Sequence, residues 1–176
     1  MKIPSQHSIT ISPCGKALLC LAAVIMLIAG YMIGTGARAA DETVSCWILC
    51  KPGSQVNARR TPDRRGQIVG YLEAGDEFRT DGTAKGGYIR VIGLGEYGEA
   101  WVYAGYVVTE KPETVGERYV CVAKSRVACR RWVDGPQVDG RPWLVNGSTV
   151  DVFLTADGWA VTSRGYIKEE WLERDP

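Results

Sequence analysis

The sequence predicts an all-β protein made of two tandem small barrels that follow an N-terminal apolar segment. Three observations favour this fold: blocks of sequence recur in the same order, β-rich segments are short and separated by turn residues, and no stretch after Ala40 has sustained helical periodicity. The 176 residues have room for one ordinary domain or two small ones. We expect an export or anchor segment, a first barrel, a linker and a second barrel, at residues 1–40, 41–109, 110–117 and 118–176.

The N-terminal segment 1–40 differs in composition from the rest of the chain. Lys2 and Lys16 are the only charged residues before Arg38, and the run 17–37 is uncharged. A positive start, an apolar run and then small residues are typical of an export signal, with cleavage after Ala39. The run also approaches the roughly 20 residues that a membrane-spanning helix needs. A cleaved signal peptide and a retained membrane anchor therefore both remain open, and either places the remainder outside the cytoplasm as a secreted or anchored protein.

The charge of the remaining chain is close to neutral. Three of the 21 basic residues lie before Ala40, whereas all 20 acidic residues follow it, which leaves 18 basic against 20 acidic residues. A protein that binds nucleic acid through its phosphates needs a broad excess of positive charge. The composition therefore argues against nucleic acid as a partner.

Four blocks of sequence occur twice in the same order. The first block begins at Cys50 and recurs from Cys121, at an offset of 71, and its last pairs are Arg59 with Arg130 and Arg60 with Arg131. The other blocks are YLEAGDEF (71–78) with WLVNGSTV (143–150), GGYIRV (86–91) with DGWAVT (157–162), and WVYAGYVV (101–108) with YIKEEWLE (166–173). The offset stays at 71 or 72 until the last block, where it falls to 65. This pattern indicates an internal duplication.

Within each copy, β-branched and aromatic residues form short runs between Gly and Asp turns. Such runs predict strands. The expected strands are 68–72, 88–92, 101–103, 106–108, 149–154 and 158–162.

The segments VNARRTP, QIVGYLEAGDEF, GGYIRV and WVYAGYVV, in this order, resemble the bacterial SH3 domain family over residues 46–109. Residues 119–173 are similar with less agreement, because Ala128 replaces the usual Asn and the turn reads VNGST. The resemblance implies two tandem SH3-like barrels, in which Trp101, Trp159 and Trp171 belong to the core.

The resemblance also implies a function. Bacterial SH3 domains often accompany wall hydrolases and hold them on peptidoglycan, so we expect a non-catalytic binding module for cell-wall peptide or another envelope component. An extended peptide would lie along aromatic rings, with arginines meeting its carboxylates. The alternative is a membrane-anchored structural or adaptor protein that binds a protein partner in an envelope complex, which a retained 17–37 span would favour. The oligomeric state stays open.

The candidate ligand-binding residues are aromatic and arginine side chains, because Trp, Tyr and Arg dominate binding hot spots. They are Tyr88, Tyr97, Tyr103, Arg59, Trp132, Arg131 and Trp143. Tyr97 lies in the hairpin tip 93–98, which is either a binding loop or a flexible turn with an exposed ring. Trp132 lies in a polar loop beside arginines, where it either forms a recognition surface or caps the open end of a barrel.

No catalytic or metal site is expected. The only histidine, His7, lies in the export segment, so Ser–His and Cys–His nucleophile pairs and a histidine-assisted zinc site are excluded from the rest. The carboxylate pairs Asp76–Glu77 and Glu169–Glu170 are interpreted as solvated surface. We therefore predict no enzyme activity, no metal and no cofactor.

Four cysteines follow the export segment. A hairpin centred on Ser125 would place Cys121 opposite Cys129, at a separation that a disulfide accepts. We predict this disulfide, with a contribution of about 2–3 kcal/mol. Cys46 and Cys50 are roughly 13 Å apart along an extended strand. Either a bend joins them, or both stay reduced, or one bonds to another chain.

Overall fold

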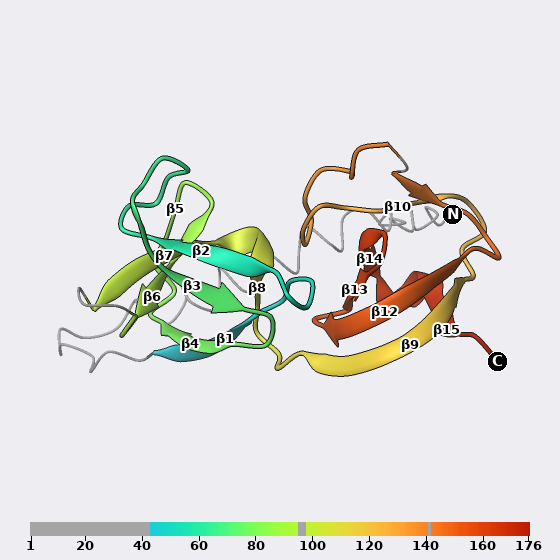
Figure 1. The fold of residues 1–176 in the computed structure, drawn as a ribbon, viewed down its shortest axis with the longest axis horizontal. Helices are drawn as coiled ribbons and strands as arrows, with labels where there is room; N and C mark the ends of the chain where they lie inside the picture. Colours follow the sequence, from blue (N-terminus) through green and yellow to red (C-terminus); the bar gives the residue numbers. More distant parts are fainter. Residues whose placement is uncertain (1–42, 95–97, 141) are drawn as a thin grey trace, which may run out of the picture. The chain divides into compact units, whose positions relative to one another are not determined.

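The computed structural model describes residues 43–94, 98–140 and 142–176, and most of these residues lie in β strands (Figure 1). We call residues 44–108 repeat 1 and residues 113–174 repeat 2. The strands of repeat 1 are β1 (Val44–Ile48), β2 (Gln55–Arg59), β3 (Ile68–Glu73), β4 (Glu77–Thr80), β5 (Ala84–Lys85), β6 (Tyr88–Ile92), β7 (Glu99–Tyr103) and β8 (Val107–Val108), with the 3-10 turn η1 (Ala104–Tyr106) before β8.

Repeat 2 has the same kinds of element in the same order, apart from β5. Its strands are β9 (Glu113–Cys121), β10 (Val127–Ala128), β11 (Trp143–Leu144), β12 (Thr149–Ala156), β13 (Trp159–Thr162), β14 (Gly165–Lys168) and β15 (Leu172–Arg174), with the 3-10 turn η2 (Glu169–Trp171) before β15. The all-β prediction is confirmed, and a strand lies at each of the expected positions. No helix in the described part of the chain has the length and apolarity to cross a bilayer, and the predicted anchor 17–37 lies outside the described residues.

The two repeats have similar strand orders. In repeat 1 the order is β3-β2-β7-β6-β4-β1-β8, and β5 also pairs with β6. In repeat 2 it is β14-β13-β12-β9-β15, with β10 and β11 as a separate pair, and β9 and β12 run side by side (Figure 1). A single bridge, Arg59 with Trp101, links the β2–β3 hairpin to the rest of repeat 1, and the bridge Arg130 with Tyr166 occupies the same place in repeat 2.

The strand register shows that the duplication extends to individual residues. The pair Val56–Leu72 of repeat 1 corresponds to the pair Val127–Leu144 of repeat 2. In the same way, Tyr88–Tyr103 corresponds to Trp159–Lys168, and Trp47–Val108 corresponds to Val120–Glu173. From Val56 to Val108, the offsets between these equivalents are the same 71, 72 and 65 that the sequence blocks display. From β2 onward, the strand pairs therefore recur at the spacing of the sequence blocks.

The first strand corrects the alignment of the cysteines. Ile48 pairs with Val107, and Cys121 pairs with Leu172 at the equivalent place. The carbonyl of Ile48 accepts the N–H of Gly75 at 2.8 Å, and the carbonyl of Cys121 accepts the N–H of Gly147 at 2.8 Å. Cys121 is thus the counterpart of Ile48, not of Cys50, because this strand is shifted by two positions relative to the alignment of the first sequence block.

The segment 110–117, expected to be a linker, is partly a strand. β9 begins at Glu113, so only the first residues of the segment connect the repeats. This connection is fixed by Asp157, whose carboxylate accepts the backbone N–H of Thr109 at 2.8 Å and that of Glu110 at 3.0 Å.

Alternation of buried and exposed side chains along the strands creates the cores. Every second residue of β12 is buried, as expected for a strand with one face on a core. One cluster lies within repeat 1 and a second within repeat 2. A third draws on both repeats, and its buried members are Leu49, Val108, Leu154, Ala156, Trp159, Val161 and Tyr166. Burial of this apolar surface is the main term that stabilises the association of the repeats.

Candidate functional site

Five aromatic rings meet where the repeats join, and we call them the junction cluster: Tyr88, Tyr103, Tyr106, Trp132 and Tyr166. The ring of Trp132 lies 5.3 Å from that of Tyr103 and 6.2 Å from that of Tyr106, measured between centroids. Tyr103 also contacts Tyr88 at 5.4 Å, and Tyr106 contacts Tyr166 at 6.4 Å. Most of these contacts are edge-to-face, the geometry that the ring quadrupoles favour.

Two glycines make room for the indole of Trp132. A Cβ atom added to Gly105 would lie 2.3 Å from Cδ1 of the indole, and one added to Gly135 would lie 2.5 Å from the same atom. The N–H of Val133 also donates to the carbonyl of Gly105 at 3.1 Å. The loop of repeat 2 that carries Trp132 is therefore seated directly on η1 of repeat 1.

A buried hydroxyl adds a polar tie to this junction. The Oη–H of Tyr166 donates to the carbonyl of Leu49 at 2.8 Å. Burial raises the pKa of the Tyr166 hydroxyl well above its usual range. The hydroxyl therefore stays protonated and keeps its role as a donor at all physiological pH values.

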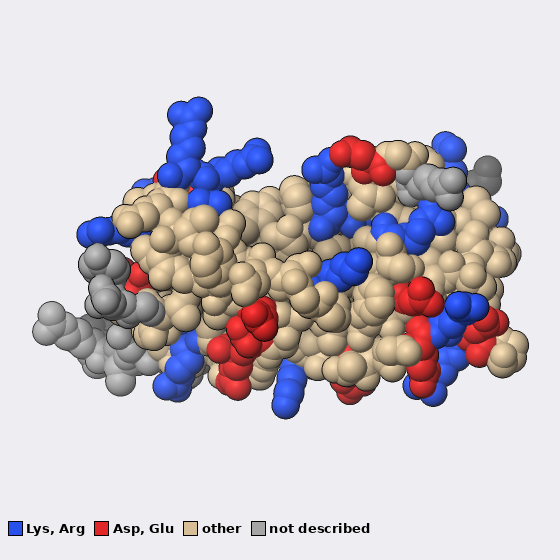
Figure 2. All heavy atoms as spheres, in the orientation of Figure 1, with Lys and Arg blue, Asp and Glu red and all other residues tan. Residues whose placement is uncertain are grey.

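A cavity of about 540 Å³ lies beside the junction, and we call it the basic groove. Four of its lining side chains are basic and one is acidic: Lys51, Arg130, Arg131, Arg164 and Asp139. The remaining wall comes from Val138 and from residues 161–166. On the upper part of the face in Figure 2, Lys and Arg side chains (blue) outnumber Asp and Glu side chains (red).

The protein holds the arginines of the basic groove in place. Nη1 of Arg130 donates to the carbonyl of Gly135 at 2.6 Å, and Nη2 of Arg164 donates to the carbonyl of Trp143 at 3.1 Å. Arg131 forms an ion pair with Asp139. These contacts orient three guanidinium groups, while one carboxylate offsets only part of their charge, so the groove favours an anionic ligand.

A second cavity, of about 330 Å³, lies on repeat 2, and we call it the open pocket. Its aromatic wall consists of Trp159 and Trp171, and its charged groups come from Arg126, Arg130, Lys168 and Glu170. Trp171 is 37 % exposed, whereas Trp159 is buried. Nζ of Lys168 lies 5.5 Å from the centroid of the Trp159 ring, within cation–π distance.

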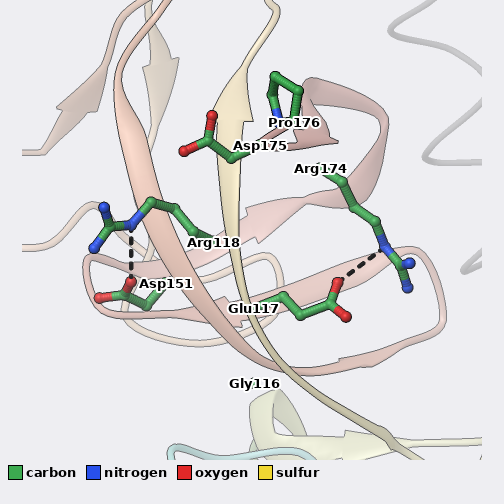
Figure 3. A pocket seen from close by; sticks show the side chains of 7 residues that line it. All are labelled: Gly116, Glu117, Arg118, Asp151, Arg174, Asp175 and Pro176. Carbon is green, nitrogen blue, oxygen red and sulfur yellow. Dashed lines mark ion pairs between the residues drawn. The ribbon is translucent and has the colours of Figure 1, made fainter.

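A third cavity, of about 670 Å³, lies among charged residues at the end of the chain (Figure 3). Arg118 pairs with Asp151 at 3.6 Å, and Arg174 pairs with Glu117 at 3.0 Å. Three acidic side chains, those of Glu117, Asp151 and Asp175, line this cavity together with the two arginines. Both arginines are already paired with carboxylates, and exposed pairs of this kind contribute little free energy.

The structure brings some of the predicted ligand-binding residues together. Tyr88, Tyr103 and Trp132 meet in the junction cluster, and Arg131 precedes Trp132 and lines the basic groove. Tyr97 lies outside the described residues.

Arg59 and Trp143 belong to other places in the fold. Nη1 of Arg59 donates to the carbonyl of Gly66 at 2.8 Å, which braces the loop after β2. Trp143 is 36 % exposed, and the guanidinium carbon of Arg126 lies 4.4 Å from the centroid of its ring.

Sequence reasoning missed several residues of these cavities. Lys51 and Arg164 line the basic groove, and Lys168 and Trp171 line the open pocket. Lys51 and Arg164 are single basic residues in turns, with no local pattern to distinguish them. Lys168 and Trp171 could have been identified from the sequence, because the repeat alignment places them at the positions of Tyr103 and Tyr106.

The predicted disulfide between Cys121 and Cys129 is wrong: the structure describes both as free, fully buried thiols. The expected hairpin does not form, because Cys121 pairs with Leu172 and β10 pairs with β11. Cys46 and Cys50 are also free and buried, which matches the alternative that both stay reduced. Burial, followed by the nearby Asp76 and Glu73, raises the pKa of Cys50 to about 11.

The described residues contain no group of three or more His, Cys, Asp or Glu side chains that would hold a metal ion. The basic groove and the open pocket present cations and aromatic rings to a ligand.

Comparison with known proteins adds distant structural neighbours. No family model and no curated protein matches the chain. NlpC1 and NlpC2 from Trichomonas vaginalis are similar at a TM-score of 0.33 each, with 15 % and 14 % identity over 82 % and 78 % of this chain. The chain spans 50 % of the length of each. The CBD of endolysin LysPBC5 is similar at a TM-score of 0.29, with 13 % identity over 74 % of this chain and 92 % of that one. Likeness at this level assigns neither family nor function.

Proposed function

We propose that this chain is a non-catalytic binding protein of the bacterial envelope, built from two SH3-like barrels, whose basic groove takes a carboxylate-bearing peptide of the cell wall. The sequence resemblance to bacterial SH3 domains supports the choice of compartment and ligand class. The observation that carries the proposal is the basic groove itself, in which four basic side chains face one carboxylate.

The size and charge of the groove suit an extended acidic peptide. Its volume of about 540 Å³ lies within the roughly 300–1,000 Å³ typical of ligand sites. Guanidinium groups bind carboxylates through two parallel hydrogen bonds, which gives both affinity and orientation. Lys51 comes from repeat 1 and Arg164 from repeat 2, so a bound peptide contacts both repeats.

The groove is also prepared for binding before a ligand arrives. Arg130 and Arg164 each donate to a backbone carbonyl, which limits the rotamers of these long side chains. Side chains that are already ordered lose less entropy on binding. The proposal places this site outside the cytoplasm, with residues 17–37 as a cleaved signal or a retained anchor, and keeps the domain bounds 41–109 and 118–176.

A pelleting experiment tests the proposal. The full-length protein in a non-ionic detergent is mixed with intact cell walls, and the fraction that sediments with the walls is measured. Walls whose carboxyl groups have been converted to amides serve as the matched control. We expect sedimentation with native walls and its loss with amidated walls, since the ligand groups are carboxylates. Protein that stays in the supernatant with native walls contradicts the wall ligand and favours the alternative, an adaptor for an envelope protein.

Variants of the basic groove locate the site. The double change Lys51→Met and Arg164→Gln removes one charge of the groove from each repeat, and we expect at least about tenfold weaker wall binding. The matched control is Lys111→Met with Arg118→Gln, which removes the same charges elsewhere on the surface. Equal losses in both proteins would show that net charge, rather than the groove, governs binding.

A further inference from the structure

Equivalent positions of the two repeats form one closed site and one open site. In repeat 1, the rings of Tyr88, Tyr103 and Tyr106 belong to the junction cluster, and Trp132 lies against two of them. Their counterparts in repeat 2 are Trp159, Lys168 and Trp171, and all three line the open pocket. Backbone hydrogen bonds support this equivalence. The N–H of Ala104 donates to the carbonyl of Gly87 at 2.9 Å in repeat 1, and the N–H of Glu169 donates to the carbonyl of Gly158 at 3.0 Å in repeat 2.

The closed site shows what this part of the fold binds. Its occupant is a loop of the protein itself, held by one apolar side chain, Trp132, and by one backbone hydrogen bond, from Val133 to Gly105. The counterpart of Gly105 in repeat 2 is Glu170. A loop segment of another protein would find there the equivalent backbone carbonyl and a similar aromatic wall.

The open pocket differs from the closed site in shape. Any Cβ at Gly105 would lie 2.3 Å from the indole of Trp132, and Glu170 has such a Cβ. An indole in the same pose would therefore clash with Glu170. The open pocket consequently requires an apolar side chain that is narrower than an indole.

The open pocket also differs in charge. Lys168 replaces Tyr103, and Arg126 and Arg130 line the same cavity, so three cations face the single carboxylate of Glu170. The guanidinium of Arg126 stacks on the ring of Trp143, which holds this cation at the rim. An apolar wall with a surplus of positive charge is complementary to an acidic residue that adjoins an aliphatic one.

We propose that the open pocket of repeat 2 is a docking site for a loop of a partner protein that presents an aliphatic side chain next to an acidic one. The occupied site on repeat 1 is the internal counterpart of this complex. The open pocket shares Arg130 with the basic groove, whereas Lys168 and Trp171 line the open pocket and not the groove. The docking proposal does not depend on the wall ligand.

Short peptides test this pocket on the full-length protein. The probes are acetyl-Leu-Asp-Gly-amide and acetyl-Leu-Asn-Gly-amide, which have the same size and differ by one charge. Binding is followed by the shifts of the tryptophan indole N–H signals in NMR spectra. We expect the Asp peptide to shift the Trp171 signal and the Asn peptide to bind about three- to fivefold more weakly. Equal binding of the two peptides, or no shift with either, would overturn the proposal.

Three variants and one control variant test which side chains of the pocket are responsible. Trp171→Ala should weaken the Asp peptide about tenfold, as for a hot-spot aromatic, whereas Tyr71→Ala, an exposed ring on repeat 1, should have no effect. Lys168→Met should reduce the preference for Asp over Asn, since Arg126 and Arg130 remain, while the Met side chain preserves the packing of the Lys168 stem. Glu170→Gly should admit acetyl-Trp-Val-Asp-Gly-amide, the sequence of the loop 132–135, which the unaltered protein should reject.

Sedimentation of the full-length protein without peptide separates the possible occupants. If the protein self-associates and Lys168→Met abolishes this association, a second copy fills the pocket and the proposal of a separate partner is wrong. Wall pelleting of the Trp171→Ala and Lys168→Met proteins should be unchanged, so failure at the pocket and failure at the basic groove are distinguishable.

Discussion

Repeats 1 and 2 share one backbone pattern but differ in the side chains at three equivalent positions. In repeat 1 these positions hold three tyrosines, and a loop of repeat 2 covers them. In repeat 2 they hold two tryptophans and a lysine, and they line a cavity. The strand register at the two places is equivalent, but the side chains differ, so an internal loop covers one place and a cavity lies at the other.

A second difference concerns charge inside the sheets. Arg90 of β6 forms an ion pair with Asp81 and a 3.2 Å pair with Glu99. The counterpart of Arg90 in repeat 2 is Val161, which is buried in the core that both repeats share. Repeat 1 thus depends on an ion pair at a place where repeat 2 depends on apolar burial, and pH should affect the two repeats unequally.

Trp132→Ala should have the largest effect on the joint. The change removes the ring that packs on Tyr103 and Tyr106, and we expect the free energy of unfolding to fall by about 2–3 kcal/mol, somewhat less than for a fully buried tryptophan. Urea unfolding of the full-length protein, followed by circular dichroism, measures this loss. Trp143→Ala removes an exposed tryptophan as the control and should cost less than about 1 kcal/mol. Similar losses in the two variants would show that the indole of Trp132 does not hold the repeats together.

The two buried thiols of repeat 2 should tolerate replacement to different degrees. Cys129 is the counterpart of Ala58, so Cys129→Ala should cost less than about 1 kcal/mol, whereas Cys121 takes the place of Ile48 and Cys121→Ala should cost about 1–2 kcal/mol. Denaturant titration of both variants gives the comparison. Dithiothreitol should leave the midpoint of the unaltered protein unchanged, because both thiols are free. A marked drop on reduction would instead reveal a disulfide.

Acid should weaken the Asp81–Arg90 pair of repeat 1. The Arg90 guanidinium lowers the pKa of Asp81 to about 2, and the two side chains are 17 % and 28 % exposed. Because the folded pKa lies below the unfolded value of about 3.9, the stabilisation is present above that value and is lost as pH falls toward 2. We expect Asp81→Asn to cost about 1 kcal/mol at pH 7, after screening by solvent, and almost nothing at pH 2. Urea midpoints of both proteins at the two pH values test this, and a pH-independent difference would exclude the ion pair as its cause.

Local sequence patterns were sufficient for the strands and for most of the duplication. Val56, Leu72 and Tyr88 lie in β-rich runs between turn residues, and their equivalents recur at offsets that the blocks display. Such patterns are informative because alternation of side chains and turn chemistry depend on near neighbours in the chain. Trp171 shows the limit, since the family resemblance predicted a core residue and the structure exposes more than a third of its surface.

The contacts between distant segments were decided by the tertiary structure. Trp132 can pack between the repeats because Gly105 has no Cβ atom. The basic groove forms because Lys51 and Arg164, which are far apart in the sequence, line the same cavity. The state of Cys121 depends on its pairing with Leu172 rather than with the nearby β10. The sequence alone determined an all-β, duplicated chain with an apolar N-terminal run, because these properties follow from local composition and period. Which side chains meet across the repeats, and which site stays open, depends on packing between segments that no local pattern records.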